Sequence, residues 1–179
     1  MHIQGDGVVV YKMKNGDTQI YVYEWEGNTP CYPAYAYDGY QSFIAHHGGD
    51  VTAVKLIRKK ICVNAEQQVL SESSEFVSLG NGVSGFVQDI SAGQLCDIEY
   101  IAVCSDGVEQ VQNLSCLEVV SSLLAFKSSN GVFATRRLNR CMKDWAKGNS
   151  NPMDDIAYAV IHVPENFGGN NVNTSNNSS

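Results

Sequence analysis

The sequence predicts a single α+β domain, and two observations carry this prediction. Continuous or alternating apolar segments, which are typical of β-strands, recur through residues 3–104 and return at residues 156–163. Between them, residues 115–147 place apolar side chains about 3.6 positions apart, which indicates amphipathic helices. The chain has 179 residues, of which 44% are hydrophobic and 17% charged, so it carries enough apolar material for one core.

Composition excludes several classes of protein. A net charge of −7 and a pI of about 4.9 argue against a nucleic-acid partner, because phosphate binding needs a cationic face. No apolar run is long enough to cross a bilayer, and the first residues do not form a signal peptide, so we expect no membrane partner. The six cysteines follow no zinc-binding spacing and several lie in apolar runs, which predicts reduced, mostly buried thiols and a cytoplasmic location.

The first strands are expected to form a hairpin. Ile3–Tyr11 places Gly5-Asp6-Gly7 between apolar residues, Lys14–Asp17 contains the Asn-Gly pair that closes hairpins, and Gln19–Trp25 returns as the second strand. The first strand begins almost at residue 1, although the backbone groups of a buried strand need partners. We therefore expect a domain that lacks its N-terminal part.

The next segments are less regular. Glu26–Tyr40 is rich in Tyr, Gly and Pro and predicts a loop that either forms a recognition surface or, as we favour, packs over the core. His46-His47 fits surface histidines better than a metal site, because adjacent side chains on a strand point to opposite faces. Val51–Val63 predicts a hairpin or two short strands. A solvated face and a phosphate contact explain its basic residues equally well: Lys55, Arg58, Lys59 and Lys60.

The middle of the chain leads to the motif around which the domain is organised. Phe76–Leu79 and Gly85–Val87 are short strand candidates, and Asp89–Gly93 is an expected turn into a strand over Leu95–Cys104. That strand stops at Ser105-Asp106-Gly107. A carboxylate held at the end of a buried strand is accessible to a cation, although the tripeptide also fits a simple turn.

Two helices are predicted after this motif. The first covers about 115–127 with Asn113 or Ser115 as its N-cap, and the second covers about 132–147. The second is expected to bury Ala134, Leu138, Cys141, Met142 and Trp145. It presents a basic stripe that is either simply solvated, which we favour, or attractive to an acidic or phosphorylated partner: Arg136, Arg140, Lys143 and Lys147.

The C-terminal part is expected to comprise a loop over 148–155, a strand over 156–163 and a disordered Asn/Ser-rich tail over 167–179. The folded domain therefore spans residues 1–166. Three aspartates lie at strand ends, namely Asp6, Asp106 and Asp154. A site made only of carboxylates favours Mg²⁺ or Mn²⁺, and zinc would require a Cys/His cluster that the sequence lacks.

The order of these motifs resembles the metal-dependent serine/threonine protein phosphatases of the PPM or type 2C family, in particular the compact bacterial and phage members. The resemblance covers about residues 3–163. It rests on Gly5-Asp6-Gly7, on Cys104–Val108 and on Asp154–Val160, with the segments Phe126-Lys127, Gly131 and Arg136-Arg137 between them.

This resemblance implies two stacked antiparallel β-sheets flanked by helices, with a dinuclear Mg²⁺ or Mn²⁺ site at which a metal-activated water attacks phosphorus. It implies that Asp106 and Asp154 hold one metal ion and that Asp6 and Asp106 can bind a third, weaker ion. Asp155 would lie behind these ligands. The phosphorylated protein substrate is the implied partner.

The sequence also departs from the family. It has no counterpart of the N-terminal Arg that grips phosphate, of the Asn-Glu/Gln-Asp motif, or of the Asp-Gly-x-Gly whose Asp bridges both metals. Such losses cost many orders of magnitude in rate, since positioning and charge neutralisation supply most of the acceleration. We therefore expect an impaired phosphatase. The alternative is an inactive remnant or pseudophosphatase that binds a protein partner through the Tyr-rich loop or the basic helix.

Overall fold

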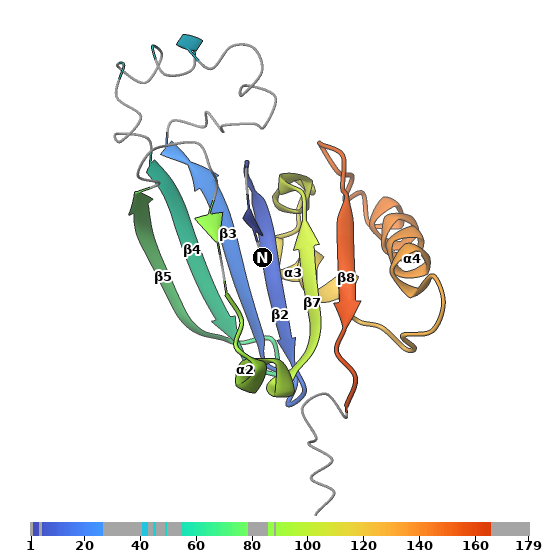
Figure 1. The fold of residues 1–179 in the computed structure, drawn as a ribbon. Helices are drawn as coiled ribbons and strands as arrows, with labels where there is room; N and C mark the ends of the chain where they lie inside the picture. The colour runs from blue at the N-terminus through green and yellow to red at the C-terminus, as the bar shows by residue number, and fades with distance from the viewer. Residues whose placement is uncertain are drawn as a thin grey trace, which may run out of the picture.

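The computed structural model describes residues 2–3, 5–26, 41–42, 45, 49, 55–78, 86–87 and 89–165. Three sequence predictions lie outside these residues: the Tyr-rich loop beyond Glu26, the pair His46-His47 and the tail at 167–179. The described part of the chain is an α+β arrangement, in which helices lie on an antiparallel sheet (Figure 1).

The sheet has six strands in the order β5-β4-β3-β2-β7-β8, and every neighbouring pair is antiparallel. Its central strands are β2 (Gly7–Met13), β3 (Thr18–Trp25) and β7 (Ile98–Cys104). The outer strands are β4 (Lys55–Val63), β5 (Val69–Ser78) and β8 (Tyr158–His162). A separate two-stranded sheet pairs β1 (His2–Ile3) with β6 (Phe86–Val87).

The β2–β3 hairpin is confirmed. The Gly16 amide donates to the carbonyl of Met13 at 3.0 Å, and the Met13 amide donates to Asp17 at 2.8 Å. Gly16 has a φ of 94°, a left-handed conformation that glycine adopts without strain. The Asn-Gly turn therefore fixes the register that faces Val10 with Ile20.

The prediction for the segment 51–63 was wrong over residues 55–63, the part that the structure describes. Instead of a hairpin or two short strands, a single strand, β4, runs from Lys55 and pairs with both β3 and β5. The sequence did not predict the first half of β5, because Ser71 through Phe76 are exposed on both faces of the sheet edge. A strand with no buried face lacks the alternation that marks strands in a sequence.

The expected turn and strand around residues 89–104 also need correction. Residues Ala92–Asp97 form a short helix, α2, and the strand β7 begins at Ile98 rather than at Leu95. Ser91 caps α2 through a reciprocal pair of hydrogen bonds with Gln94. Leu95 of this helix packs against one face of the sheet.

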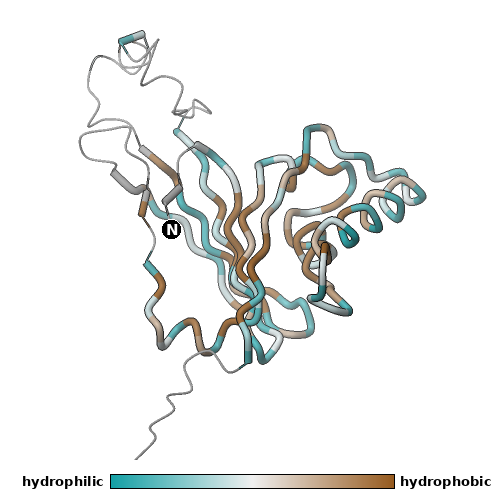
Figure 2. Tube along the Cα trace, turned by 45° about the vertical axis from the view of Figure 1, so that its right-hand side comes forward, coloured by the Kyte–Doolittle hydropathy of each residue, from teal (hydrophilic) through white to brown (hydrophobic). Residues whose placement is uncertain are grey.

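Both predicted helices are present and cover the other face of the sheet, although the first ends at Leu123 and not near Lys127 (Figures 1 and 2). Helix α3 (Cys116–Leu123) is capped by Ser115, whose hydroxyl accepts a hydrogen bond from the Glu118 amide. Helix α4 (Phe133–Lys147) buries Cys141 and Trp145. Met142 was expected in the core but is 39% exposed, because it lies on the outer side of the helix.

The main core lies between this sheet face and the two helices. Its fully buried side chains are aliphatic residues of the central strands and of α3, and each Val, Leu or Ile among them contributes about 1.5–3 kcal/mol by leaving water. They include Val8, Val10, Ile20, Ala102, Val119, Val120 and Leu123. Figure 2 shows that the central strands and the inner side of the helical layer are the hydrophobic parts of the trace.

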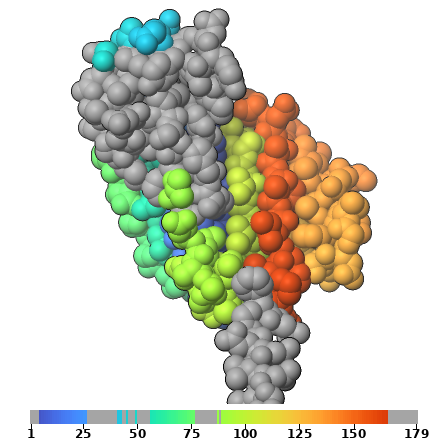
Figure 3. Space-filling view, viewed as in Figure 1, coloured from blue at the N-terminus to red at the C-terminus, as the bar shows by residue number. Residues whose placement is uncertain are grey.

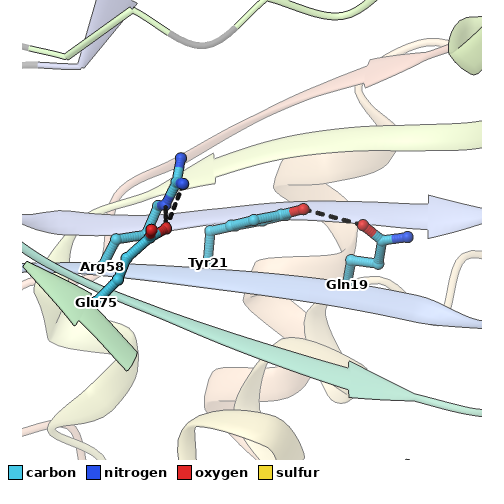
Figure 4. A network of polar contacts seen from close by, with 4 residues as sticks. All are labelled: Gln19, Tyr21, Arg58 and Glu75. Atoms are coloured by element: carbon cyan, nitrogen blue, oxygen red, sulfur yellow. Dashed lines mark hydrogen bonds and ion pairs between the residues drawn. The ribbon is translucent and has the colours of Figure 1, made fainter. Parts of the chain in front are cut away.

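The opposite face of the sheet has a second cluster that includes Val9, Tyr23 and Ile101. Towards β5, polar contacts replace apolar ones: Arg58 donates to Glu75 across the β4–β5 pair, and the Tyr21 hydroxyl donates to Gln19 at 3.0 Å (Figure 4). At the other end, β7 and β8 form part of the surface in Figure 3. Val103 is 43% and Ile161 is 63% exposed there.

The α+β class is thus confirmed for the described residues, whereas the sandwich of two stacked sheets stays a prediction. None of the helices in the described residues combines the length and the apolar composition that crossing a bilayer requires.

Candidate divalent-cation site

The site begins with a clamp between the end of β7 and the segment that leads into β8. The hydroxyl of Ser105 donates to the carbonyl of Asp155 and accepts from the amide of Ala157, each at 3.0 Å. The Ser105 amide also donates to the Ala157 carbonyl at 2.8 Å. Two segments fifty residues apart in the chain are therefore joined by three hydrogen bonds at one serine.

Gly107 permits this close approach. A Cβ atom at this position would lie 2.9 Å from the carbonyl carbon of Asp155 and closer still to its oxygen, a separation that real side chains do not reach. Gly7 has a similar role at the start of β2, where a Cβ would lie 2.6 Å from the carbonyl oxygen of Cys104. The Ser-Asp-Gly and Gly-Asp-Gly patterns thus have a packing reason in this fold.

The two segments remain paired beyond the clamp. The Met153 amide donates to the Gln110 carbonyl at 2.8 Å, and the Gln112 amide donates to Asn151 at 3.0 Å. Val111 and Pro152 form an isolated antiparallel bridge. This pairing holds the 3₁₀ helix Asp106–Glu109 beside Asp154.

Asp106 and Asp154 meet at one side chain. The amide nitrogen Nε2 of Gln110 lies 3.0 Å from Oδ2 of Asp106 and 3.5 Å from Oδ2 of Asp154. Both carboxylates therefore face a single point that an electropositive group already occupies. Asp154 is further oriented by the Asp155 amide, which donates to its Oδ1 at 2.7 Å.

Asp6 lies near Asp106, in a cavity that Asp154 does not line. Together they line a cavity of about 380 Å³ that also involves the end of β3 and the 3₁₀ helix. Its remaining lining residues are Tyr23, Glu24, Trp25, Glu109 and Gln110. Asp106 thus belongs both to the pair with Asp154 and to a cleft whose charged lining residues are all acidic.

Glu109 is a partly buried carboxyl group of this cleft with a raised pKa. Burial is the largest of the effects that together raise the pKa of Glu109 to about 7; the charges of Glu24, Asp106 and Asp6 act in the same direction, and that of Lys59 opposes them. Lys59 forms an ion pair of 2.6 Å with Glu24, so its positive charge acts on both Glu24 and Glu109. The cleft consequently contains a carboxyl group that exchanges its proton near neutral pH.

The donor set fits a hard divalent cation only in part. Mg²⁺ and Mn²⁺ prefer carboxylate oxygens at about 2.0–2.2 Å with water in the other positions. To meet this preference at the position of the Gln110 amide nitrogen, the Asp106 oxygen at 3.0 Å would have to approach by about 0.9 Å and the Asp154 oxygen at 3.5 Å by about 1.4 Å. Within the described ranges, however, no group of three or more His, Cys, Asp or Glu side chains surrounds one point. Asp6 is near the pair but does not complete such a group.

Sequence reasoning missed three residues of this site, namely Gln110, Glu109 and Glu24. Glu109 and Gln110 follow shortly after Ser-Asp-Gly. The short 3₁₀ helix that directs their side chains has no periodic pattern by which the sequence could reveal it. Glu24 comes from a different strand, and only the pairing of β2 with both β3 and β7 brings it near Asp106.

Comparison of the chain with protein-family models, with curated protein sequences and with solved structures finds no match.

Proposed function

We propose that this chain is a phosphatase-type domain in which Asp106 and Asp154 hold one Mg²⁺ or Mn²⁺ ion and which hydrolyses phosphomonoesters of proteins slowly. The observation that carries the proposal is the convergence of both carboxylates on the Gln110 amide. A cation at that point would displace the amide and neutralise two like charges that face each other.

A bound Mg²⁺ or Mn²⁺ ion would supply Lewis acidity and a more acidic water. The chain's own residues would supply the rest. Ser105 and Gly107 fix the two carboxylates through the backbone, and Gln110 orients them. Glu109 can hold or release a proton at neutral pH beside the same cavity. With only two converging carboxylates among the described residues, the geometry supports weak cation binding and slow turnover.

The proposal includes the two-layered fold. In a sandwich, a second sheet would pack on the sheet face opposite α3 and α4. Val103 and Ile161 leave apolar area exposed on that face, which an opposing layer would bury.

The second candidate is a phosphatase-like module that binds a protein partner without turnover. It is favoured because only two carboxylates converge among the described residues, whereas a phosphatase of this type needs enough ligands to hold a bridged pair of metal ions. Under this candidate the clamp at Ser105 serves stability, and a cation at Asp106 is structural or absent. Its cytoplasmic location, like that of the first candidate, is a prediction.

The two candidates are separated by a cation titration and an activity assay on the same protein. Mn²⁺ binding would be measured by calorimetry, and hydrolysis of p-nitrophenyl phosphate and a phosphopeptide would be followed with millimolar Mn²⁺. We expect binding and hydrolysis in the unaltered chain and the loss of both in Asp106→Asn and Asp154→Asn. Asp89→Asn makes the same charge change at an exposed position outside the cleft and should preserve both.

Binding without hydrolysis would select the second candidate. Absence of Mn²⁺ binding in the unaltered chain would contradict the cation site itself, as would equal binding by the unaltered chain and Asp106→Asn.

A further inference from the structure

A second concave surface lies away from the acidic cleft, between the end of α3 and the first half of α4. It has a volume of about 320 Å³ and shares no lining residue with the cleft. Its lining side chains combine aromatic rings with cations and include no acidic residue. The residues that matter here are Phe126, Lys127, Phe133, Arg136, Arg137 and Arg140.

The aromatic floor of this groove is rigid. Phe126 and Phe133 meet edge to face, with ring centroids 4.9 Å apart. Both rings also pack on Tyr100 of β7, at 5.0 Å and 6.4 Å. His162 of β8 also packs on Tyr100, with ring centroids 5.1 Å apart. The floor is therefore anchored to the sheet and would not rearrange when a ligand binds.

Two arginines are held in place by neutral groups. Arg136 donates to the carbonyl of Asn130 at 2.7 Å, and Arg137 donates to the carbonyl of Ser122. In the part of the chain that the structure describes, neither forms an ion pair with a carboxylate. Each guanidinium therefore keeps its full charge and further N–H donors while its position is fixed.

The remaining cations are more open. Arg140 has a side chain that is 63% exposed, and its contact with Asp144 is loose, at 3.7 Å. Helix α4 carries five basic residues and a single acidic one, in a chain whose net charge is −7. Arg136 and Arg140 are four positions apart, a spacing at which like charges repel on a helix. An anion in the groove would relieve this repulsion.

We propose that this groove binds a phosphorylated segment of a partner protein, with the phosphate between Arg136, Arg137 and Arg140 and a neighbouring apolar side chain on Phe126 and Phe133. Arginine clusters favour phosphate because the planar guanidinium donates two parallel hydrogen bonds to its oxygens. The aromatic floor favours a peptide over a free anion. The overall negative charge of the chain disfavours a nucleic acid.

This inference gives the second candidate function a class of partner, but it requires neither the cation site nor turnover. Binding would be measured in the presence of EDTA, by fluorescence polarisation of a short fluorescein-labelled peptide with a central Phe-phosphoserine pair. The comparison probes are the same peptide without phosphate and a fluorescein-labelled single-stranded oligonucleotide. We expect the phosphopeptide to bind at least about tenfold more tightly than either probe.

Two double variants locate the binding. Arg136→Gln with Arg140→Gln removes two charges inside the groove and should weaken phosphopeptide binding about tenfold. Lys143→Gln with Lys147→Gln removes two charges from the same helix outside the groove and should change binding by less than about twofold. Equal losses in the two variants, equal binding of the unphosphorylated peptide, tighter binding of the oligonucleotide, or no binding would each overturn the proposal.

A measurement on the unaltered chain removes any dependence on how the variants fold. Phenylglyoxal modifies accessible arginines, and mass spectrometry of the digested protein locates each modified side chain. The phosphopeptide should protect Arg136, Arg137 and Arg140 but not Arg58, which lies on the sheet beside Glu75. Unchanged modification of the three groove arginines would contradict the proposal.

Discussion

Gly107 lies against the backbone carbonyl of Asp155 so closely that no side chain fits between them. This contact joins the end of β7 to the segment that carries Asp154. It is the reason that a glycine follows Asp106, apart from any role in turning the chain. The geometry of the candidate site therefore depends on the absence of a Cβ atom at residue 107.

Gly107→Ala should destabilise the domain by about 1–3 kcal/mol, because the added methyl group forces the two segments apart. The free energy of unfolding would be measured by urea denaturation. Gly93→Ala is the matched control, since a Cβ at Gly93 in α2 has no neighbouring atom within 4 Å. It should be neutral or stabilising by up to about 1 kcal/mol. Equal effects of the two substitutions would show that the contact with Asp155 does not matter.

Ser105→Ala should cost about 0.5–1.5 kcal/mol, because it removes both side-chain hydrogen bonds of the clamp, while water can reach the exposed Asp155 carbonyl and Ala157 amide that lose their partner. It should also weaken Mn²⁺ binding although it removes no carboxylate. Ser73→Ala, on the exposed face of β5, should stay within about 0.5 kcal/mol of the unaltered chain. A Ser105→Ala protein with unchanged stability would refute the clamp.

Glu109 should make the stability of the metal-free protein fall as pH rises. The pKa of Glu109 is about 7 in the folded chain against an ordinary value of 4.5, so between these values the folded state binds the proton more strongly than the unfolded state. The stabilisation is complete below about pH 4.5 and is lost as pH rises through 7. Urea denaturation across this range in EDTA would measure it.

Glu109→Gln should flatten this dependence and make the protein more stable than the unaltered chain at pH 8, because the neutral amide needs no proton. Glu165→Gln, at an exposed position after β8, should leave the dependence in place. If the free energy of unfolding of Glu109→Gln depends on pH as steeply as that of the unaltered chain, a group other than Glu109 causes the pH dependence.

Asp106→Asn should have opposite effects with and without metal. In EDTA it should stabilise the fold by a few tenths of a kcal/mol, the size of a like-charge repulsion, since the charge of Asp106 opposes Glu109 and faces Asp154. With Mn²⁺ at 100 times its dissociation constant, the unaltered chain should gain about 2.7 kcal/mol that the variant lacks. Thermal unfolding under both conditions would reveal this reversal of order. If the difference in stability between Asp106→Asn and the unaltered chain is the same in EDTA and in Mn²⁺, no cation binds at Asp106.

Much of the fold could be predicted from local signals. The Asn15-Gly16 turn and the apolar runs on either side predict the β2–β3 hairpin. The start of α3 was predicted with Asn113 or Ser115 as its N-cap, and the structure selects Ser115. The 3.6-residue period predicts α4 almost to the residue. These elements are visible in the sequence because each buries one face and has a chemical signal at an end.

The parts that escaped prediction lack such a signal. β5 is a sheet edge with two exposed faces, and α2 is too short to establish a helical period. In the site, the approach of Asp106 to Asp154 could be expected from the positions of both at strand ends. The side chain of Gln110 between them, and the perturbed Glu109, depend on the 3₁₀ helix and on the pairing of distant segments.

The Ser105 clamp has a consequence for the order in which the chain folds. Its partners are separated by fifty residues that include both long helices. Closing so long a loop costs entropy that only the docked helices can offset. We therefore expect the carboxylate pair to assemble late, after the rate-limiting barrier, so that Ser105→Ala accelerates unfolding while leaving the refolding rate nearly unchanged.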